Sequence, residues 1–279
     1  MINFIYDILT LGKVILQSKG CSRREPRHHK SIVVMGNGPS LGKVISEQRD
    51  ILMSMDRMAV NFAANAAEFT DIKPQYYILA DPHFFTGGGT DQNVSRLWDR
   101  LRAVDWEMTM WLPTRYRREA EKAISGLGDN VRVKWFNLTP SERGGALTRR
   151  LIDAGLAMPR PRNVLIPAIM CAMREGYDEI ILTGADHSWL QSLWVDDENR
   201  VVSVQPHFYK DKKDELERVA SVYAGYHLHD ILGSMVVAFR SYFEIADYAR
   251  RRGVSILNAT PGSFIDAFER IDFSQKQPR

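Results

Sequence analysis

The sequence SIVVMGNGPSL at residues 31–41 decides the fold that we expect for this chain. Residues 32–35 are apolar and largely β-branched, as in a buried strand, and the run ends abruptly at Gly36. Turn-forming residues follow as far as Ser40, and an amphipathic segment begins near Lys43. A strand, a tight turn and a helix start open many α/β folds, in which a ligand phosphate lies at the turn. The turn matches neither GxGxxG nor GxxxxGK[ST], and similar turns occur in α/β proteins that bind no nucleotide.

The composition is that of a globular protein. With 279 residues, 44% of them apolar and 25% charged, the chain is long enough for one large α/β domain or two small ones. The 37 basic and 34 acidic residues leave a net charge of +3, which is too balanced to indicate nucleic acid as the main partner. Cys21 and Cys171 provide neither a disulfide framework nor a metal site, and a reducing cytoplasm fits this cysteine usage best.

Strand-like and helix-like segments alternate along the rest of the chain. Strands are predicted near 57–61, 75–80, 107–112, 131–136, 178–184 and 254–258, and helices over 93–104, 115–124, 144–157 and 163–176. Residues 213–252 are mostly helical in pattern and are interpreted as two helices that part near Gly233, and a short helix is expected to end at Arg270. The alternation predicts an α/β fold with a single Rossmann-like, doubly wound, mainly parallel sheet and helices on both faces. The irregular segment at about 187–212 is expected to be a lid-like insertion.

Residues 1–30 are expected to form an N-terminal helix and a basic linker ahead of a Rossmann-like catalytic domain over 31–279. Asp7 and Lys13 interrupt the apolar run before the roughly 20 residues that a membrane span needs. No convincing small-residue cleavage site follows, so no secretory signal is expected. The helix is interpreted either as an interfacial helix that touches a membrane through residues 1–20, or as a helix packed on the domain or on a second subunit.

Polar residues follow five of the predicted strands. Because the carboxyl ends of parallel strands lie along one edge of a sheet, these side chains are expected to gather where Rossmann-like folds bind ligands. The five residues are Asn37, Asn61, Asp81, Asp186 and Asn258. Each alone could equally cap a turn or a helix. The five together favour a ligand site at this edge.

Three histidines, His83, His187 and His207, lie in loops beside that edge. A neutral imidazole suits general-base catalysis, and His207, two residues before Tyr209 in the irregular segment, is the predicted base. Asp186 and His187 are an alternative pair, as a base and its orienting partner or with one of them holding a metal. The sequence contains no HxxxH, CxxC or DxD element, so no dedicated metal site is predicted.

Several motifs resemble, in the same order, bacterial sialyltransferases that decorate lipooligosaccharide. They are GNGPSL at 36–41, VNF at 60–62, MCAMREGYDEIILTGAD at 170–186, and the closing Asn258, Pro261 and Ser263. A wider group of proteins from bacterial polysaccharide loci shares this skeleton and is similar to the archaeal 6-hydroxymethylpterin pyrophosphokinases. GADHSW at 184–189 and HFY at 207–209 are closer to that wider group. The resemblance covers most of residues 31–270 in outline.

The resemblance implies a transferase that moves a nonulosonic or Kdo-like sugar acid from a CMP-activated donor to a surface-polysaccharide acceptor. The implied reaction is inverting, requires no cofactor, and uses His207 as general base with Asp186 and His187 nearby. In this scheme Asn37 and the glycine backbone beside it face the donor phosphate, Asn61 binds the nucleotide or the donor sugar, and Ser263 lies near the cytidine. The full set of implied nucleotide-binding and donor-binding residues is Gly36, Asn37, Gly38, Ser40, Asn61, Asp81, Ser188, Tyr209, Asn258 and Ser263. The implied enzyme is cytoplasmic, works at the inner face of the inner membrane, and is compatible with a homo-oligomer.

Some residues depart from the sialyltransferase pattern. Asp81 stands where that family carries an amide, and Ser188 and Trp189 stand where its tyrosines steady the leaving phosphate. Arg162 is only approximately in the place of an expected arginine. Asp81 and Asp186 could jointly hold Mg²⁺ against the phosphates of a nucleotide. The alternatives are therefore a Mg²⁺-dependent, pyrophosphokinase-like phosphotransferase that uses ATP, and a binding or scaffold protein that has kept the fold without the chemistry.

Overall fold

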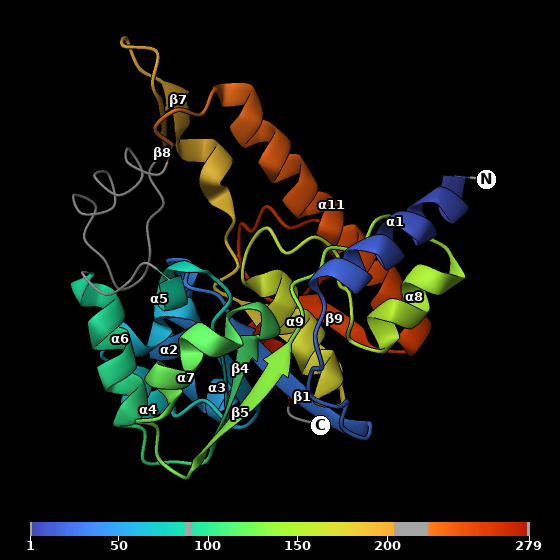
Figure 1. The fold of residues 1–279 in the computed structure, drawn as a ribbon. Helices are drawn as coiled ribbons and strands as arrows, with labels where there is room; N and C mark the ends of the chain where they lie inside the picture. Colours follow the sequence, from blue (N-terminus) through green and yellow to red (C-terminus); the bar gives the residue numbers. More distant parts are fainter. Residues whose placement is uncertain (1, 87–90, 204–222, 278–279) are drawn as a thin grey trace.

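A computed structural model describes residues 2–86, 91–203 and 223–277 of the chain. Its centre is an eight-stranded sheet in the order β10-β9-β6-β1-β2-β3-β4-β5, in which every neighbouring pair is parallel (Figure 1). The strands are β1 (His28–Met35), β2 (Asp56–Val60), β3 (Tyr76–Ile78), β4 (Met108–Pro113), β5 (Val131–Phe136), β6 (Tyr177–Thr183), β9 (Ser255–Asn258) and β10 (Glu269–Arg270). The predicted doubly wound, parallel α/β sheet is confirmed.

Helices cover both faces of the sheet, and an apolar core lies between the sheet and the helices on each face. Side chains of β1 alternate between these two cores. Ile32 and Val34 belong to one core, and Val33 and Met35 to the other. The first core is covered by α1 (Ile2–Gln17), α8 (Ala146–Asp153), α9 (Leu165–Arg174) and α11 (Leu228–Arg252). The second is covered by α2 (Ser40–Glu47), α3 (Arg49–Met53), α4 (Phe69–Ile72), α5 (His83–Thr86), α6 (Gln92–Arg102) and α7 (Arg117–Ile124). Burial on both faces explains why the strands contain continuous apolar runs.

The path of the chain reverses at β1. From β1 the chain proceeds outward through β2 to β5, and then returns to place β6 on the other side of β1. In open α/β sheets the crevice at such a reversal lies outside the carboxyl ends of the strands and is where ligands bind. The sheet therefore places the end of β1 and the end of β6 side by side at the expected binding edge.

Two predictions about the C-terminal part are wrong. Helix α11 runs unbroken through Gly233, because Ile231 and Met235 on either side of it pack in a small apolar cluster with Val201 of β8. Such packing outweighs the roughly 1 kcal/mol that one glycine costs a helix. The segment before Arg270 contains no helix, and it ends in the short edge strand β10. The part of the predicted helical segment at 213–222 lies outside the described residues.

The lid-like insertion contains a 3₁₀ helix η4 (Ser188–Ser192) and an antiparallel hairpin of β7 (Leu193–Val195) and β8 (Val201–Ser203). Figure 1 shows this hairpin projecting away from the central sheet beside the start of α11. The remainder of the predicted lid, 204–212, lies outside the described residues.

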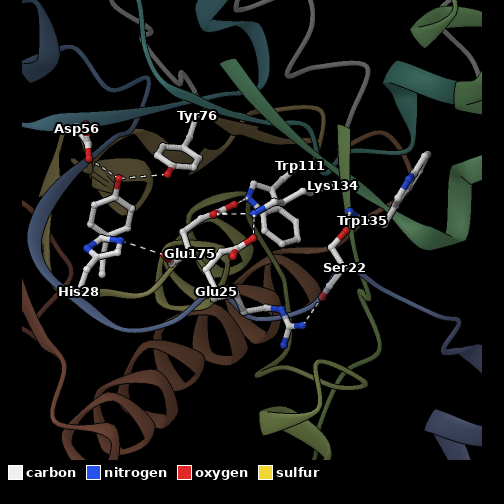
Figure 2. Close-up of polar contacts among 11 residues, drawn as sticks. Ser22, Glu25, His28, Asp56, Tyr76, Trp111, Lys134, Trp135 and Glu175 are labelled. Atoms are coloured by element: carbon white, nitrogen blue, oxygen red, sulfur yellow. Dashed lines mark hydrogen bonds and ion pairs between the residues drawn. The ribbon is translucent and has the colours of Figure 1, made fainter. Parts of the chain in front are cut away.

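The segment expected to be a basic linker is tied to the sheet. Its last three residues are the start of β1, which begins at His28 rather than at residue 31. Lys134 on β5 forms ion pairs with Glu25 of this segment and with the buried Glu175, at 2.7 and 2.8 Å (Figure 2). Trp111 Nε1 donates a hydrogen bond of 2.8 Å to the other oxygen of Glu175. The linker is therefore fixed on the protein by a partly buried polar network.

Helix α1 packs along α8 at the periphery of the molecule (Figure 1). Asp7 accepts hydrogen bonds from the backbone N–H groups of Gly145 and Thr148, at 2.7 and 2.8 Å, at the start of α8. Among the described residues, no helix has the length and apolar character needed to cross a membrane.

Candidate functional site

A cavity of about 130 Å³ lies at the carboxyl edge of the sheet, where the chain path reverses. The turns after β1 and β6 form two of its walls, and the end of β2 and the start of α9 form the rest. The lining residues are Gly36, Asn37, Gly38, Pro39, Val60, Asn61, Asn163, Val164, Leu165, Gly184, Asp186, His187, Ser188 and Trp189. The structure thus brings together three of the five predicted strand ends.

The glycines of the first turn allow two backbones to touch. The Gly36 N–H donates to the carbonyl of Thr183 at 2.7 Å, and the Gly38 N–H donates to that of Gly184 at 2.9 Å. A Cβ atom on Gly36 would lie 2.3 Å from the Gly184 carbonyl oxygen. These two N–H groups were expected to face a phosphate. They are instead committed to the turn after β6, because the turns pack backbone against backbone.

The position expected for a phosphate holds a carboxylate of the protein. Asp186 accepts a 2.7 Å hydrogen bond from the Ser40 hydroxyl and a longer one, 3.4 Å, from the Ser40 N–H at the start of α2. Helix N-termini favour anions, and here the anion is a side chain. Burial raises the pKa of Asp186, while the Ser40 hydrogen bonds act in the opposite direction. Ser40 therefore holds Asp186 in place.

A chain of hydrogen bonds fixes the proton on His187. Asn163 Oδ1 accepts from the Leu165 N–H at 3.0 Å, and it also accepts from the Tyr242 hydroxyl at 2.9 Å. Because that hydroxyl has only one proton, it must accept the 2.7 Å hydrogen bond that joins it to His187 Nε2. Nε2 therefore carries the proton, and Nδ1 presents a lone pair. Asp186 and His187 bond to different partners and do not form the predicted dyad.

Burial lowers the pKa of His187 to about 3. The imidazole is therefore neutral at physiological pH and is a weak proton acceptor. His187 adopts a left-handed backbone conformation with φ of 51°, which asparagine also tolerates. The ring packs against Trp189, with the ring centroids 4.2 Å apart and the planes tilted by 31°, and both aromatic rings line the cavity.

Two amide atoms of the cavity are buried without a hydrogen-bond partner among the described residues. They are the acceptor Oδ1 of Asn61 and the donor Nδ2 of Asn163. The orientation of the Asn163 amide is set by the two donors to its oxygen, so its nitrogen is identified as the unused group. Buried polar atoms of this kind call for a partner such as a ligand or an ordered water. The described lining contains no Lys or Arg, so the cavity suits an uncharged polar ring better than a phosphate.

Asp81, Asn258 and Ser263 are absent from the described lining of the cavity. Asp81 is exposed and accepts from the His83 N–H at 2.8 Å. Asn258 donates to the Ile265 carbonyl at 3.1 Å, and the Ser263 hydroxyl donates to the Ala185 carbonyl at 2.6 Å, so both hold the loop after β9 together.

Asp81 and Asp186 follow strands β3 and β6, which are separated by β1 and β2. Three interstrand spacings place those strands roughly 14 Å apart. Two carboxylates that share one Mg²⁺ must approach within a few ångströms. In the described part of the chain, no group of three or more His, Cys, Asp or Glu side chains is arranged to hold a metal.

His207 and Tyr209 lie outside the described residues, so the predicted base remains a prediction. His83, the third loop histidine, pairs with Asp91 at 2.8 Å and does not line the cavity. Ser188 lines the cavity, and its predicted contact with the donor remains a prediction.

The sequence interpretation missed Asn163 and Tyr242. Asn163 was assigned to a helix start, and its position just before the helix was the available signal. Tyr242 lies within α11 and meets Asn163 across 79 positions of sequence. No local pattern identifies such a contact.

We expect the stability of the protein to fall by about 2 kcal/mol from pH 7.5 to pH 5 because of His187. In the unfolded chain this histidine takes up a proton below its ordinary pKa of 6.5, whereas in the folded protein its pKa is about 3. The unfolded state therefore binds more protons as the pH falls, and stability is lost. Asp186, whose pKa is raised, contributes in the opposite direction.

The substitution His187→Asn tests this expectation, because asparagine suits the backbone conformation and does not titrate. Urea unfolding of both proteins at each pH measures the difference, in which groups common to both cancel. An equal loss of stability in the two proteins would show that His187 does not cause it.

No known protein family matches the sequence, and no curated protein does. Among solved structures, a similar one is the MAf glycosyltransferase from Magnetospirillum magneticum AMB-1, with 11% identity and a TM-score of 0.48. The match covers 99% of this chain and 39% of the other, so this chain spans well under half of that protein. FabMG, described as a novel type of enoyl-acyl carrier protein reductase, also has 11% identity, with a TM-score of 0.20 over 87% of this chain and 64% of the other.

Proposed function

We propose that this protein is a cytoplasmic glycosyltransferase of the sialyltransferase-like type. It would transfer a nonulosonic or Kdo-like sugar acid from a CMP-activated donor to a surface-polysaccharide acceptor. The ordered sequence motifs and the position of the cavity at the reversal point of a parallel sheet support this proposal. The observation that carries it is the pair of unsatisfied amide groups in a cavity whose described lining has no cation.

The two unsatisfied amide groups favour binding of an uncharged ring of the donor in the cavity. Asn61 Oδ1 needs a hydrogen-bond donor and Asn163 Nδ2 needs an acceptor, which a pyrimidine edge or neighbouring sugar hydroxyls provide together. Trp189 and His187 offer aromatic surface to such a ring. Asp186 would repel a phosphate placed beside it. We therefore place an uncharged ring of the donor in the cavity and its phosphate outside.

The reaction would be a direct displacement. The acceptor hydroxyl oxygen attacks the anomeric carbon, the bond from that carbon to the phosphate oxygen breaks, and CMP leaves with the electron pair. His207 is the proposed general base for the hydroxyl proton, since the low pKa of His187 makes that histidine a poor one. No cofactor is part of this scheme.

The Mg²⁺-dependent phosphotransferase is the less favoured alternative. It would bind the phosphates of ATP through a metal shared by Asp81 and Asp186. Asp81 is exposed, and the strands that carry the two residues are separated by two others.

Calorimetric titration with CMP and with ATP, each with Mg²⁺ or with EDTA, tests the function. We expect CMP to bind with the same affinity in both conditions. Binding of ATP alone, and only with Mg²⁺, would overturn the transferase proposal in favour of the phosphotransferase.

Two substitutions are expected to weaken CMP binding by about tenfold each, as the loss of one hydrogen bond predicts. Asn61→Gly removes the amide while keeping the left-handed backbone, which has φ of 47°. Asn163→Asp keeps the oxygen that accepts from Leu165 and Tyr242 and replaces the unused donor with a second carboxylate oxygen. Asn93→Asp, an exposed position on α6, is the matched control for the added charge. Equal affinities for Asn163→Asp and the control would remove Asn163 from the site.

A further inference from the structure

We propose that the outer face of α1, together with an apolar stripe on α11, docks the protein on an anionic lipid bilayer. This proposal rests on the surface of the molecule and is independent of the proposed reaction. The bilayer would bury the apolar side chains and neutralise arginines beside them.

The outer face of α1 is apolar without interruption. Its exposed large side chains include Leu16, Ile15 and Phe4, which are 84%, 73% and 68% exposed. At about 100° per residue, the large apolar side chains and Gly12 share one arc of roughly 160° that contains no polar residue. The members of this arc are Ile2, Phe4, Ile5, Ile8, Leu9, Gly12, Ile15 and Leu16. A contiguous exposed apolar surface of this kind marks an interaction site.

The opposite face of α1 holds the helix on the protein through Val14, which belongs to the first core, and through polar residues. Asp7 accepts from the start of α8, and the Thr10 hydroxyl accepts from the Glu142 N–H at 3.0 Å. Lys13 forms an ion pair with Glu142. These contacts fix the orientation of α1 on the folded protein. The apolar arc therefore faces outward while the helix remains packed in place.

The apolar surface continues onto α11. Leu228, Leu232, Val236 and Phe243 are exposed and follow one another at helical spacing. Ile2 at the start of α1 and Phe243 line the same hollow, of about 470 Å³. In Figure 1 the later part of α11 passes close to α1, and the shared hollow brings the two apolar surfaces near each other at Ile2 and Phe243.

The charges around the hollow favour an anionic partner. The acidic residues that line the hollow are already ion-paired. The pairs are Glu142 with Lys13, Glu244 with Arg143, and Asp247 with Arg250. Arg149 and Arg251 line the same hollow and have no ion-pair partner among the described residues.

A second copy of the chain fits this surface less well than a bilayer. A two-fold interface places the same patch of both subunits face to face, so the unpaired arginines of each copy would face a patch whose acidic groups already have cations. Lipid phosphates would instead pair with Arg149 and Arg251 while acyl chains cover the arc.

Sedimentation with vesicles of phosphatidylcholine, with and without phosphatidylglycerol, tests the proposal. The wild-type protein is expected to bind, and to bind better when phosphatidylglycerol is present. Ile8→Glu with Leu16→Glu should weaken binding to both by on the order of tenfold or more. Arg149→Gln with Arg251→Gln should weaken binding only to the anionic vesicles, by several-fold, and the difference should shrink in high salt.

Met53→Glu is the matched control and should leave vesicle binding unchanged. The Met53 side chain is exposed on α3, which covers the other face of the sheet. The replaced side chains are exposed except that of Arg149, which is partly buried, and thermal unfolding checks that each variant is folded. Wild-type protein that does not bind vesicles, or double variants that bind as the control does, would overturn the proposal. If the wild-type protein is a dimer and Ile8→Glu with Leu16→Glu makes it a monomer, the surface binds a second copy of the chain instead.

Discussion

Lys134→Ala is expected to lower the free energy of unfolding by roughly 3–5 kcal/mol. The lysine ammonium lies 2.8 Å from Glu175, a carboxylate whose side chain is 4% exposed. Truncation would leave that carboxylate buried with the Trp111 N–H as its remaining partner (Figure 2). It would also release Glu25 and with it the segment that leads into β1. An uncompensated buried charge is the main cause of the expected loss.

Urea unfolding of Lys134→Ala and of Lys73→Ala measures this effect against a control. Lys73 pairs with Asp105 at 3.1 Å on the surface, and such pairs contribute at most about 1 kcal/mol. The double substitution Lys134→Met with Glu175→Gln removes both charges and should recover much of the loss. If Lys134→Ala unfolds at the same urea concentration as Lys73→Ala, the buried ion pair contributes nothing.

The sheet could be predicted from the sequence because its strands are buried on both faces. Residues 32–35 and 180–182 are apolar without alternation, and in a chain of alternating strands and helices such short runs are typical of a parallel sheet covered on both sides. The unbroken course of α11 could not be predicted, because the packing of Ile231 and Met235 against Val201 is a tertiary contact that the local sequence around Gly233 does not show.

The place of the site was easier to predict than its chemistry. The turn at 36–38, Asn61 and the turn at 186–188 do line one cavity, because parallel strands bring their carboxyl ends to one edge. The roles inside it depend on distant partners. Asp186 takes the helix N-terminus that was expected to be free for a phosphate, and Asn163 and Tyr242 meet through tertiary structure alone.

Gly36→Ala is expected to abolish CMP binding and to lower the free energy of unfolding by about 3 kcal/mol. The added methyl group would lie 2.3 Å from the Gly184 carbonyl oxygen and 2.9 Å from its carbon. Both are backbone atoms at the end of a central strand, so they cannot move aside as a flexible side chain would. The turns after β1 and β6 would separate, and with them two walls of the proposed donor cavity.

Gly42→Ala is the matched control within the same segment. Gly42 lies inside α2, and a methyl group added there would have no heavy atom within 4 Å beyond its own helix backbone and chain neighbours. Alanine should therefore raise stability by up to about 1 kcal/mol and leave CMP binding unchanged. Urea unfolding and calorimetry on both variants also decide what Gly36 does. If Gly36 were needed only for the close approach of a ligand, Gly36→Ala would lower the affinity for CMP and leave the free energy of unfolding unchanged. Because its neighbour is the backbone of another strand end, we expect both quantities to fall together.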